Sequence, residues 1–464
     1  AGRGVAIRNF PLEKGHGFAD YLFYIDGKAA GVIEAKREGA TLTGVEIQSA
    51  KYSGGFPPSL PVYIRPLPFL YQSTGVETRF TNELDPTPRS RPTFSFHKPE
   101  MLAKWLEEAR LEEANPIPRD QAALRGETYK SFPTLRKRLQ NLPPLKEEGL
   151  WPAQKIAINN LEQSLAQDRP RALIQMATGS GKTFTAITAI YRLIKFAGAR
   201  RVLFLVDRGN LGDQTLKEFQ QYVSPYNNFK FTEEFIVQRL SSNTLDTTAR
   251  VCISTIQRMF SMLKGKELAD EDDEVSAAGL ESLFKKPEPI DYNPAIPIET
   301  FDVIITDECH RSIYNLWAQV LEYFDAYLIG LTATPSKQTF GFCHQNLVME
   351  YPHEQAVADG VNVNYDVYRI RTGISEAGST VDAGFYVEKR VRETRKTRWE
   401  QLDDDFSYDP NQLDRDVVAP DQIRTIVKTF RDKLPTEIYQ DRTEVPKNPV
   451  FAKDHAHAEQ IIEI

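Results

Sequence analysis

The chain has 464 residues, which is enough for about three domains that each bury a core. Its formal net charge of −7 argues against general affinity for nucleic acid, although a local basic surface can still bind phosphates. The three cysteines, Cys252, Cys309 and Cys343, lack metal-ligand and disulfide spacing, and no apolar run approaches the about twenty residues of a membrane span. We therefore expect a cytoplasmic protein that does not enter a membrane.

The first hundred residues contain the pattern of a β-hairpin. Residues 18–25 and 30–36 are rich in apolar and aromatic side chains, and the Asp-Gly-Lys run at 26–28 between them is typical of a hairpin turn. Short strand-like runs at 68–72 and 93–96 are expected to extend the same sheet, with their aromatic rings in its core.

Three side chains of the hairpin form a candidate magnesium nuclease site. Asp20 and Glu34 lie on adjacent antiparallel strands, and Lys36 points to the same face as Glu34 because alternate residues of a strand share a face. Two carboxylates can hold Mg²⁺ and activate water against a phosphodiester, while the lysine stabilises developing charge. Acidic residues at strand ends can also be ordinary solvated positions.

A glutamine and a tyrosine follow this hairpin. Gln48 and Tyr52 are four residues apart in an expected helix and so share a face. An Asp…Glu-x-Lys core followed by Gln-x-x-x-Tyr resembles the nuclease domain of type I restriction enzyme motor subunits. The resemblance implies a restriction-endonuclease-like fold over residues 1–98, in which the Asp, Glu and Lys are catalytic and Gln48 and Tyr52 are accessory. Residues 99–148, charged and helix-favouring before a Pro-Pro break, are expected to form a helical linker.

The central motif is the glycine-rich stretch at 175–183. It lies between an apolar strand-like run at 171–174 and a helical pattern at 184–190, and strand, glycine turn, helix is a phosphate-binding arrangement. Met176 stands where the strict motif has its first glycine, and a chance glycine turn is the alternative. We expect ATP to be bound by Thr178, Gly179, Ser180, Gly181, Lys182 and Thr183. The Thr183 hydroxyl is the expected magnesium ligand.

A second acidic motif follows the apolar run at 301–306. Asp307 is expected to hold the Mg²⁺ of the nucleotide, Glu308 to orient and deprotonate the attacking water, and His310 to connect the site with the next element. A further strand at 327–331 leads into Thr-Ala-Thr-Pro at 332–335. An ordered series of motifs on successive strand ends is the pattern of an α/β motor core.

These motifs resemble those of superfamily-two helicases and translocases. The resemblance implies a first RecA-like lobe at 149–350, with Gln154 reading the adenine edge through its two-sided amide. It assigns Thr332 and Thr334 to coupling. Arg208, Thr255 and Gln257 follow strand patterns on the ligand-binding edge of the sheet and are the candidates for DNA phosphate contacts. Residues of about 264–300 are acidic and proline-rich, and we expect a surface insertion that is partly disordered and has no chemistry.

The last hundred residues are expected to start a second lobe. Residues 351–446 form a connecting region with a strand at 365–370 and a helix at 422–430, and a strand at 448–454 and a helix at 457–462 would begin a second RecA-like lobe. Because the chain begins without a methionine and stops inside this lobe, we expect a piece of a longer polypeptide. In the superfamily the second lobe supplies arginines to the nucleotide site, so this piece is expected to hydrolyse ATP poorly.

Taken together, the motifs resemble the restriction subunit of a type I restriction-modification enzyme. The resemblance implies ATP-dependent translocation of double-stranded DNA, Mg²⁺-dependent cleavage away from the recognition site, and assembly with methyltransferase and specificity subunits. Two alternatives remain open. One is a stand-alone nuclease-translocase of DNA repair or phage defence, and the other is a nucleotide-gated DNA-binding scaffold with a degenerate nuclease domain.

Overall fold

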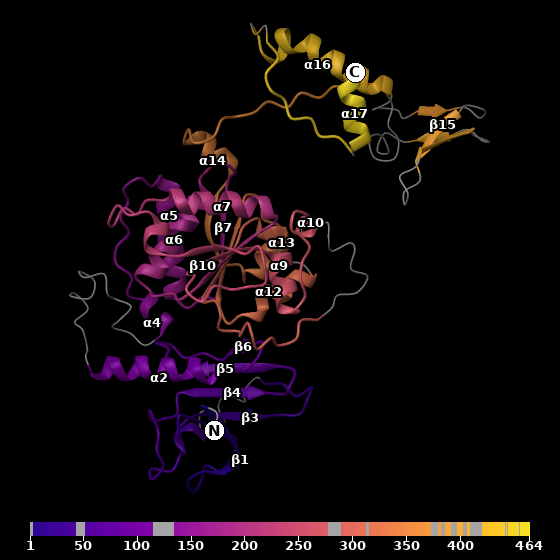
Figure 1. Ribbon diagram of the computed structural model, residues 1–464. Helices are drawn as coiled ribbons and strands as arrows, with labels where there is room; N and C mark the ends of the chain where they lie inside the picture. Colours follow the sequence, from indigo (N-terminus) through magenta and orange to yellow (C-terminus); the bar gives the residue numbers. More distant parts are fainter. Residues whose placement is uncertain are drawn as a thin grey trace. The chain divides into compact units, whose positions relative to one another are not determined.

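The computed structural model divides the chain into two compact units, Ala1–Val363 and Asn364–Ile464 (Figure 1). The residues that it describes are 3–42, 52–114, 134–276, 289–311, 315–372, 379–381, 386–390, 397–401, 406–408, 420–440, 442, 444–453 and 455–464. Of the helices among these residues, none is long and apolar enough to cross a membrane.

The first unit opens with a six-stranded sheet whose strands follow one another in sequence order. Its strands are β1 (Gly4–Pro11), β2 (Phe18–Ile25), β3 (Lys28–Ala35), β4 (Phe69–Ser73), β5 (Thr78–Asn82) and β6 (Arg91–Thr93). Only β3 and β4 pair in parallel, and the other neighbours are antiparallel. The expected hairpin is confirmed as β2 and β3. Asp26 and Gly27 both have positive φ, as the tightest hairpin turns require.

Two details of this sheet differ from the expectation. The strand expected at 93–96 is wrong, because β6 ends at Thr93 and the next residues leave the sheet. Phe94 and Phe96 are therefore partly exposed, whereas Phe69 and Tyr71 on β4 are core residues as expected. Phe94 instead packs against Tyr323, with ring centroids 4.7 Å apart.

The helix α2 (Pro99–Ala114) is part of this first layer and not a free linker. Its apolar residues Leu102, Ala103 and Leu106 are buried in one cluster with Phe69 and Tyr71 of β4. Residues three and four apart on a helix share a face, which explains why these three side chains reach the sheet together. The short helix α4 (Leu135–Leu139) follows.

The second sheet is seven-stranded and parallel throughout. Its spatial order is β13 (Leu347–Tyr351), β7 (Arg171–Met176), β12 (Tyr327–Thr332), β11 (Val303–Thr306), β8 (Val202–Val206), β10 (Val251–Thr255) and β9 (Val237–Arg239). The parallel α/β class expected for this region is confirmed. Parallel strands are covered on both faces by their crossover helices, which explains their continuous apolar sequences.

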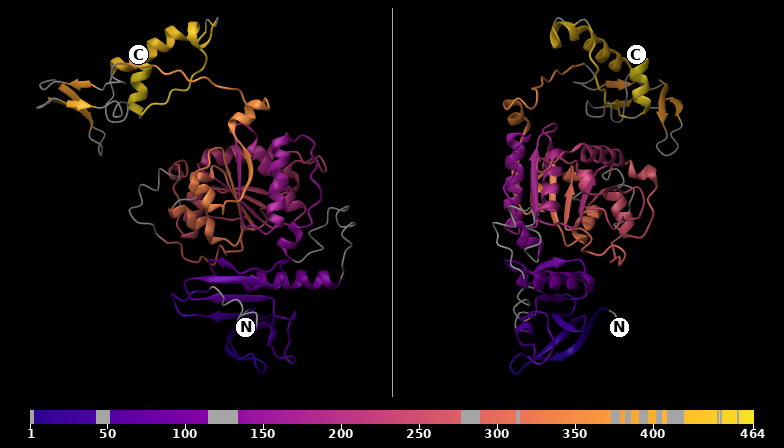
Figure 2. Two further views of the ribbon diagram at one scale, coloured as in Figure 1. Left: turned by 180° about the vertical axis from the view of Figure 1, so that it is seen from behind. Right: turned by 60° about the vertical axis from the view of Figure 1, so that its left-hand side comes forward.

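Helices cover both faces of the parallel sheet, as the two views in Figure 2 show. One face is covered by α5 (Pro152–Ala166), α6 (Lys182–Lys195) and α7 (Gly209–Gln221), and the other by α9 (Ile256–Leu263) and α12 (Asn315–Tyr323). Strand β8 shows the alternation. Phe204 packs on the first face, and Leu203 and Leu205 pack on the second.

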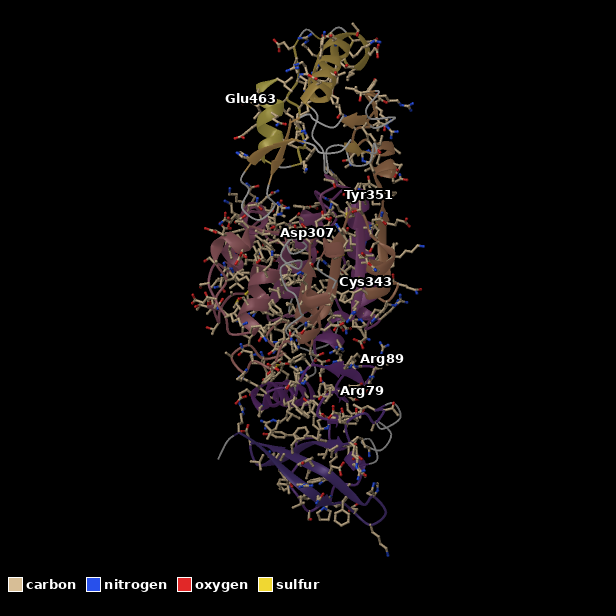
Figure 3. The ribbon with its side chains drawn as sticks, turned by 90° about the vertical axis from the view of Figure 1, so that its right-hand side faces the viewer. Arg79, Arg89, Asp307, Cys343, Tyr351 and Glu463 are labelled. Atoms are coloured by element: carbon tan, nitrogen blue, oxygen red, sulfur yellow. The ribbon has the colours of Figure 1, made fainter. Side chains whose placement is uncertain are left out.

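The first sheet docks on the parallel sheet at the edge where the parallel strands begin. Asp325 directly precedes β12 and receives two hydrogen bonds from the Arg91 guanidinium of β6, both 2.8 Å long. His97 Nε2 lies 3.0 Å from the same carboxylate. Arg89 reaches the carbonyls of Gln167 and Asp168 ahead of β7. Arg89 and Asp307, labelled in Figure 3, lie at opposite edges of the parallel sheet.

The described part of the acidic insertion is packed rather than loose. Ile290, Ile296 and Ile298 are buried in the core of the second face, and the short helix α10 (Asp270–Asp273) buries Asp273. The expectation of a surface loop is therefore wrong for these four residues. Residues 277–288 lie outside the described part.

The second unit contains small elements. Strand β14 (Ser379–Val381) pairs with β17 (Phe406–Tyr408), β15 (Tyr386–Arg390) pairs with β16 (Thr397–Gln401), and the helices are α16 (Pro420–Lys433) and α17 (His455–Glu463). Both helices agree with the expectation. The strands expected at 365–370 and 448–454 are wrong, since the described residues of those runs are irregular and Phe451 is exposed.

Candidate nuclease and nucleotide-binding sites

The hairpin β2–β3 brings Asp20, Glu34 and Lys36 together as expected. Tyr21 lies opposite Ile33 in the antiparallel register, which places Asp20 beside Glu34. The Asp20 carboxylate accepts a hydrogen bond from the backbone N–H of Ala35 at 2.8 Å, and Lys36 Nζ donates to Glu34 Oε1 at 2.6 Å.

Glu34 is the most constrained member of this group. Glu34 is only 2% exposed, and its Oε2 is buried without a hydrogen-bond partner among the described residues. Burial raises the pKa of Glu34, and the neighbouring Asp20 adds to this, while Lys36 opposes it. The hydrogen bond to Glu34 raises the pKa of Lys36 in turn.

These atoms suit a divalent cation. An unpartnered buried carboxylate oxygen beside a second carboxylate is a donor set for Mg²⁺, which commonly takes one or two carboxylates and keeps several waters. Within the described ranges no cluster of three or more metal-binding side chains occurs. Tyr52 packs against the apolar cluster that includes Leu22 and Val32, on one face of the sheet. It also lies close enough to Lys36 to raise the pKa of that amine. Gln48 lies outside the described residues.

The glycine-rich loop joins β7 to α6. Gly179 and Gly181 have φ of 82° and 81°, a conformation that glycine adopts readily, and Gly181 is the N-cap of α6. Ser180 turns its hydroxyl inward and donates to the carbonyl of Ala177 at 2.6 Å. Lys182 is the first residue of the helix, so its ammonium group and the N–H groups of the helix N-terminus can bind the same anion.

Gln154 lies directly against this loop. It is buried, and a Cβ atom on Gly181 would be 2.3 Å from its Nε2. Its Oε1 accepts a hydrogen bond from the Trp151 backbone N–H at 2.9 Å. The amide oxygen is therefore engaged as a helix cap, and its role in reading adenine stays a prediction.

The acidic motif begins where β11 ends. Burial raises the pKa of Asp307 to about 6, the charge of Glu308 adds to this, and Lys182 opposes it. Strands β7 and β11 are separated by β12 in the sheet, so the charge of Lys182 acts on Asp307 across the carboxyl ends of these strands. Glu308 has a positive φ of 47°, which is uncommon for a residue with a side chain.

His310 connects the acidic motif to β12. Its Nδ1 lies 3.1 Å from the Thr332 hydroxyl and 3.4 Å from Glu308 Oε2, and Thr332 Oγ1 also accepts from the backbone N–H of Thr334. A continuous path of contacts thus runs from Glu308 to the Thr-Ala-Thr run. This path is the arrangement that a coupling role needs, and that role stays a prediction.

The three residues expected to contact DNA differ in how exposed their side chains are. Thr255 and Gln257 are 0% and 2% exposed, so neither side chain is accessible to a phosphate in this structure, and their role in DNA contact stays a prediction. Thr255 is the N-cap of α9, and Gln257 donates to the carbonyls of Asp207 and Val275. Arg208, whose side chain is 48% exposed, remains accessible and lies 3.5 Å from Asp207.

Comparison with known proteins identifies relatives of both halves of the first unit. Residues 148–337 match a family described as "Type III restriction enzyme, res subunit", and residues 1–61 match "Type I restriction enzyme EcoKI endonuclease subunit second domain". The EcoKI endonuclease subunit of Escherichia coli K12 is 25% identical over 521 residues. That alignment covers 99% of this chain and 40% of the relative.

The chain is similar in sequence to type I restriction endonuclease subunits.

Two other relatives are consistent with this. The EcoAI endonuclease subunit of Escherichia coli is 28% identical over 314 residues, which cover 66% of this chain and 32% of that protein. A solved fragment described as an HsdR subunit from Vibrio vulnificus YJ016 is 23% identical and covers 77% of this chain and 56% of that one, with a TM-score of 0.31. The chain therefore spans less than half the length of the curated relatives named here.

Two further residues adjoin the candidate nucleotide site, and no sequence motif marks them. Burial raises the pKa of Glu218 of α7, and the nearby Thr183, the expected magnesium ligand, opposes this. The charge of Glu218 in turn contributes to the raised pKa of Asp307. Asn362 Nδ2 donates to the carbonyl of Thr178 at 3.0 Å, and its Oδ1 faces Gly179. Both are far from the loop in sequence, and no local pattern marks them.

Proposed function

We propose that this chain is the nuclease and first motor part of a type I restriction subunit, which cleaves DNA in a reaction that depends on ATP-driven translocation of the duplex. The observation that carries the proposal is the presence of both sites in one compact unit. Asp20, Glu34 and Lys36 meet in the first sheet, and the loop at Lys182 meets Asp307 in the second.

The N-terminal sheet is, in this proposal, a restriction-endonuclease-like nuclease domain. Asp20 and Glu34 would hold Mg²⁺, which when bound supplies a polarised water and offsets phosphate charge. Lys36 keeps its proton, since the hydrogen bond to Glu34 raises its pKa, and so offers positive charge to the developing pentavalent phosphate. Tyr52 packs against Leu22 of β2 and Val32 of β3 in one apolar cluster and so stabilises the hairpin.

The parallel sheet is, in this proposal, a RecA-like motor lobe. The loop amides and Lys182 bind the ATP phosphates, Thr183 and Asp307 would hold the nucleotide's Mg²⁺, and Glu308 takes the proton of the attacking water. Hydrolysis is then relayed through the His310–Thr332 contact to the DNA-facing elements. Double-stranded DNA is the proposed substrate, with methyltransferase and specificity subunits as partners that select the site.

Separate substitutions in the two sites test this proposal. In the full-length parent protein with its co-purified subunits, Lys182→Ala should abolish both ATP hydrolysis and cleavage, because cleavage depends on translocation. Glu34→Gln should abolish cleavage, by at least about a hundredfold in rate, while DNA-stimulated ATPase activity persists. Glu38→Gln is the matched control, since it removes an exposed carboxylate four residues further on and should leave both activities intact.

The outcomes also separate the alternatives. Cleavage that survives Lys182→Ala would contradict the restriction mechanism. A chain that purifies alone and still cuts DNA with ATP would indicate a stand-alone nuclease-translocase. Cleavage that is unchanged by Glu34→Gln and Asp20→Ala would leave the nuclease assignment without support and favour a DNA-binding scaffold.

A further inference from the structure

The acidic segment 270–276 lies on the edge of the parallel sheet where β8 and β10 end. Asp273 is only 4% exposed despite its charge. Its Oδ1 accepts a hydrogen bond from the Thr255 hydroxyl, and its Oδ2 lies 3.2 Å from Arg258 Nε and 3.4 Å from Arg239 Nη2. One carboxylate of the segment therefore collects a hydroxyl and two guanidinium groups.

The neighbouring carboxylate occupies the start of a helix. Glu274 Oε2 accepts a hydrogen bond from the backbone N–H of Asn210 at 3.1 Å, within the first turn of α7. Its Oε1 lies so close to Gly209 that a Cβ atom there would be 2.4 Å away. The N-terminus of a helix carries unsatisfied N–H groups and partial positive charge, so an anion is stabilised at this position.

The last two residues of the segment, Val275 and Ser276, also make polar contacts. Ser276 donates its hydroxyl proton to Asp207 Oδ1 at 2.9 Å, and the carbonyl of Val275 accepts from Gln257 Nε2 at 2.5 Å. The segment thus follows the edge from the end of β10 to the end of β8. These strands are direct parallel neighbours, with Thr255 opposite Val206.

The groups beneath the segment are those that proteins use for a sugar–phosphate backbone. Phosphate contacts come from arginine, threonine, glutamine and helix N-termini, and here all four occur on two adjacent strand ends. The two carboxylates of the segment bind the threonine, the arginines and the helix N-terminus in place of phosphates, and the carbonyl of Val275 accepts from the glutamine. This explains why Thr255 and Gln257, on an edge suited to nucleic acid, are buried.

We propose that residues 270–276 are an intramolecular substitute for a phosphate backbone, which occupies part of the motor lobe's DNA track and must be displaced when duplex DNA binds. The inference rests on the proposed function, because it concerns regulation of the same DNA-driven motor. The exchange replaces carboxylates by phosphates on the same donors, so the arginines keep an anionic partner in both states. The lobe is thereby held closed to DNA until a duplex competes for the edge.

Charge removal on the segment tests the proposal. The variant Asp273→Asn with Glu274→Gln keeps the shape of both side chains and removes both charges. In the full-length parent protein, binding of a fluorescent duplex without a specific site should tighten by at least about fivefold. The plot of log affinity against log salt should also steepen by about 0.9 for each phosphate newly contacted.

The matched control is Glu271→Gln with Asp272→Asn. These two side chains belong to the same segment, are exposed, and change the net charge by the same amount. A long-range effect of charge would appear equally in both double variants, and equal affinities in the two would overturn the proposal. Tighter binding and a steeper salt slope confined to the first variant would support it.

Folding is controlled by a milder variant. Glu274→Gln alone leaves the Asp273 network intact and should still tighten duplex binding, by about twofold or more, with an unchanged melting temperature. Unchanged affinity in Glu274→Gln and in the folded double variant would overturn the inference while the wild type still showed DNA-stimulated ATPase activity. Failure of the proposed function would look different, since the wild type itself would then show no ATPase response to DNA.

Discussion

At the scale of single residues, the nucleotide site carries an ionisable group whose environment opposes its ionised form. Asp307 is half-buried and adjoins Glu308, and its desolvation and the charge of Glu308 raise its pKa from 3.8 to about 6. Between these two pH values the folded protein binds more protons than the unfolded chain, so ionisation of Asp307 lowers stability as the pH rises through about 6. The site thus gives up stability for a carboxylate placed to hold a cation.

This sign can be measured with Asp307→Asn. Without nucleotide or magnesium at pH 7.5, the variant should be more stable than the wild type by up to about 2–3 kcal/mol. The reason is that the substitution removes a carboxylate whose ionised form is unfavourable in the folded protein. The difference should shrink as the pH falls below about 6 and approach zero only below about pH 3.8. Melting temperatures of both proteins across this range check it, and a difference that does not change with pH would contradict the assignment.

Asn362 contacts the glycine-rich loop although no sequence motif predicts this contact. It stands one residue before the end of the first unit, on a chain that Gly360 turns back after α14 (His353–Ala358) with a positive φ of 72°. That turn brings its amide onto the carbonyl of Thr178. A side chain nearly two hundred residues away thereby restrains the phosphate loop, as the sequence separation of this hydrogen bond shows.

At the scale of elements, the two sheets are joined by charges buried between them. Burial by itself would raise the pKa of Asp325, but the Arg91 guanidinium and His97 hold it well below its usual range. The contact links β6 to the start of β12, at the edge opposite the nucleotide loop. The ion pair therefore fixes the first sheet to the start of β12 in the parallel sheet.

Asp325→Asn should weaken this attachment strongly. The substitution leaves Arg91 with only the more distant Asp85 carboxylate, 3.6 Å away, and removing one partner of a buried ion pair typically costs about 3–5 kcal/mol. The loss should be fully present at neutral pH and vanish only below about pH 4, since the folded pKa of Asp325 is lowered and its stabilisation disappears on protonation. Urea unfolding curves of the wild type and the variant measure it.

Glu322→Gln is the control for that experiment. Glu322 pairs with Arg171 at 3.5 Å, and its side chain is 55% exposed. Exposed ion pairs contribute about 0–1 kcal/mol, so this variant should unfold close to the wild type. Equal losses in the two variants would show that Asp325 does not hold the sheets together.

At the scale of the whole molecule, this chain corresponds to about 40% of the EcoKI endonuclease subunit that it resembles. A motor of this superfamily is expected to complete its nucleotide site with arginines from a second lobe, and such an arginine is worth about three to five orders of magnitude in rate. We expect residues 1–464 to bind Mg-ATP but to turn it over poorly, with little response to DNA. Binding of a fluorescent ATP analogue, compared with phosphate release, tests both parts, and strong DNA-stimulated turnover by these residues would refute the expectation.

The sequence alone determined the features that depend on local pattern. The hairpin β2–β3, the glycine loop before α6 and the acidic motif after β11 each follow from a few adjacent residues, because turn conformation and strand burial are local properties. The parallel α/β class followed from the same order of motifs. The strands expected at 365–370 and 448–454 failed for a complementary reason, since a strand needs a neighbour for its hydrogen bonds and apolar residues alone do not provide one.

Only the tertiary structure decided which distant residues share a site. Sequence pattern could not show that α2 packs on the first sheet, that Asp325 holds Arg91, or that Asn362 lies on the glycine loop. It also could not show that Asp273 covers Thr255, which turned a candidate DNA contact into a buried one. These contacts join residues far apart in the chain, and they arise because packing in three dimensions brings together groups whose charges and hydrogen bonds must be satisfied once they are buried.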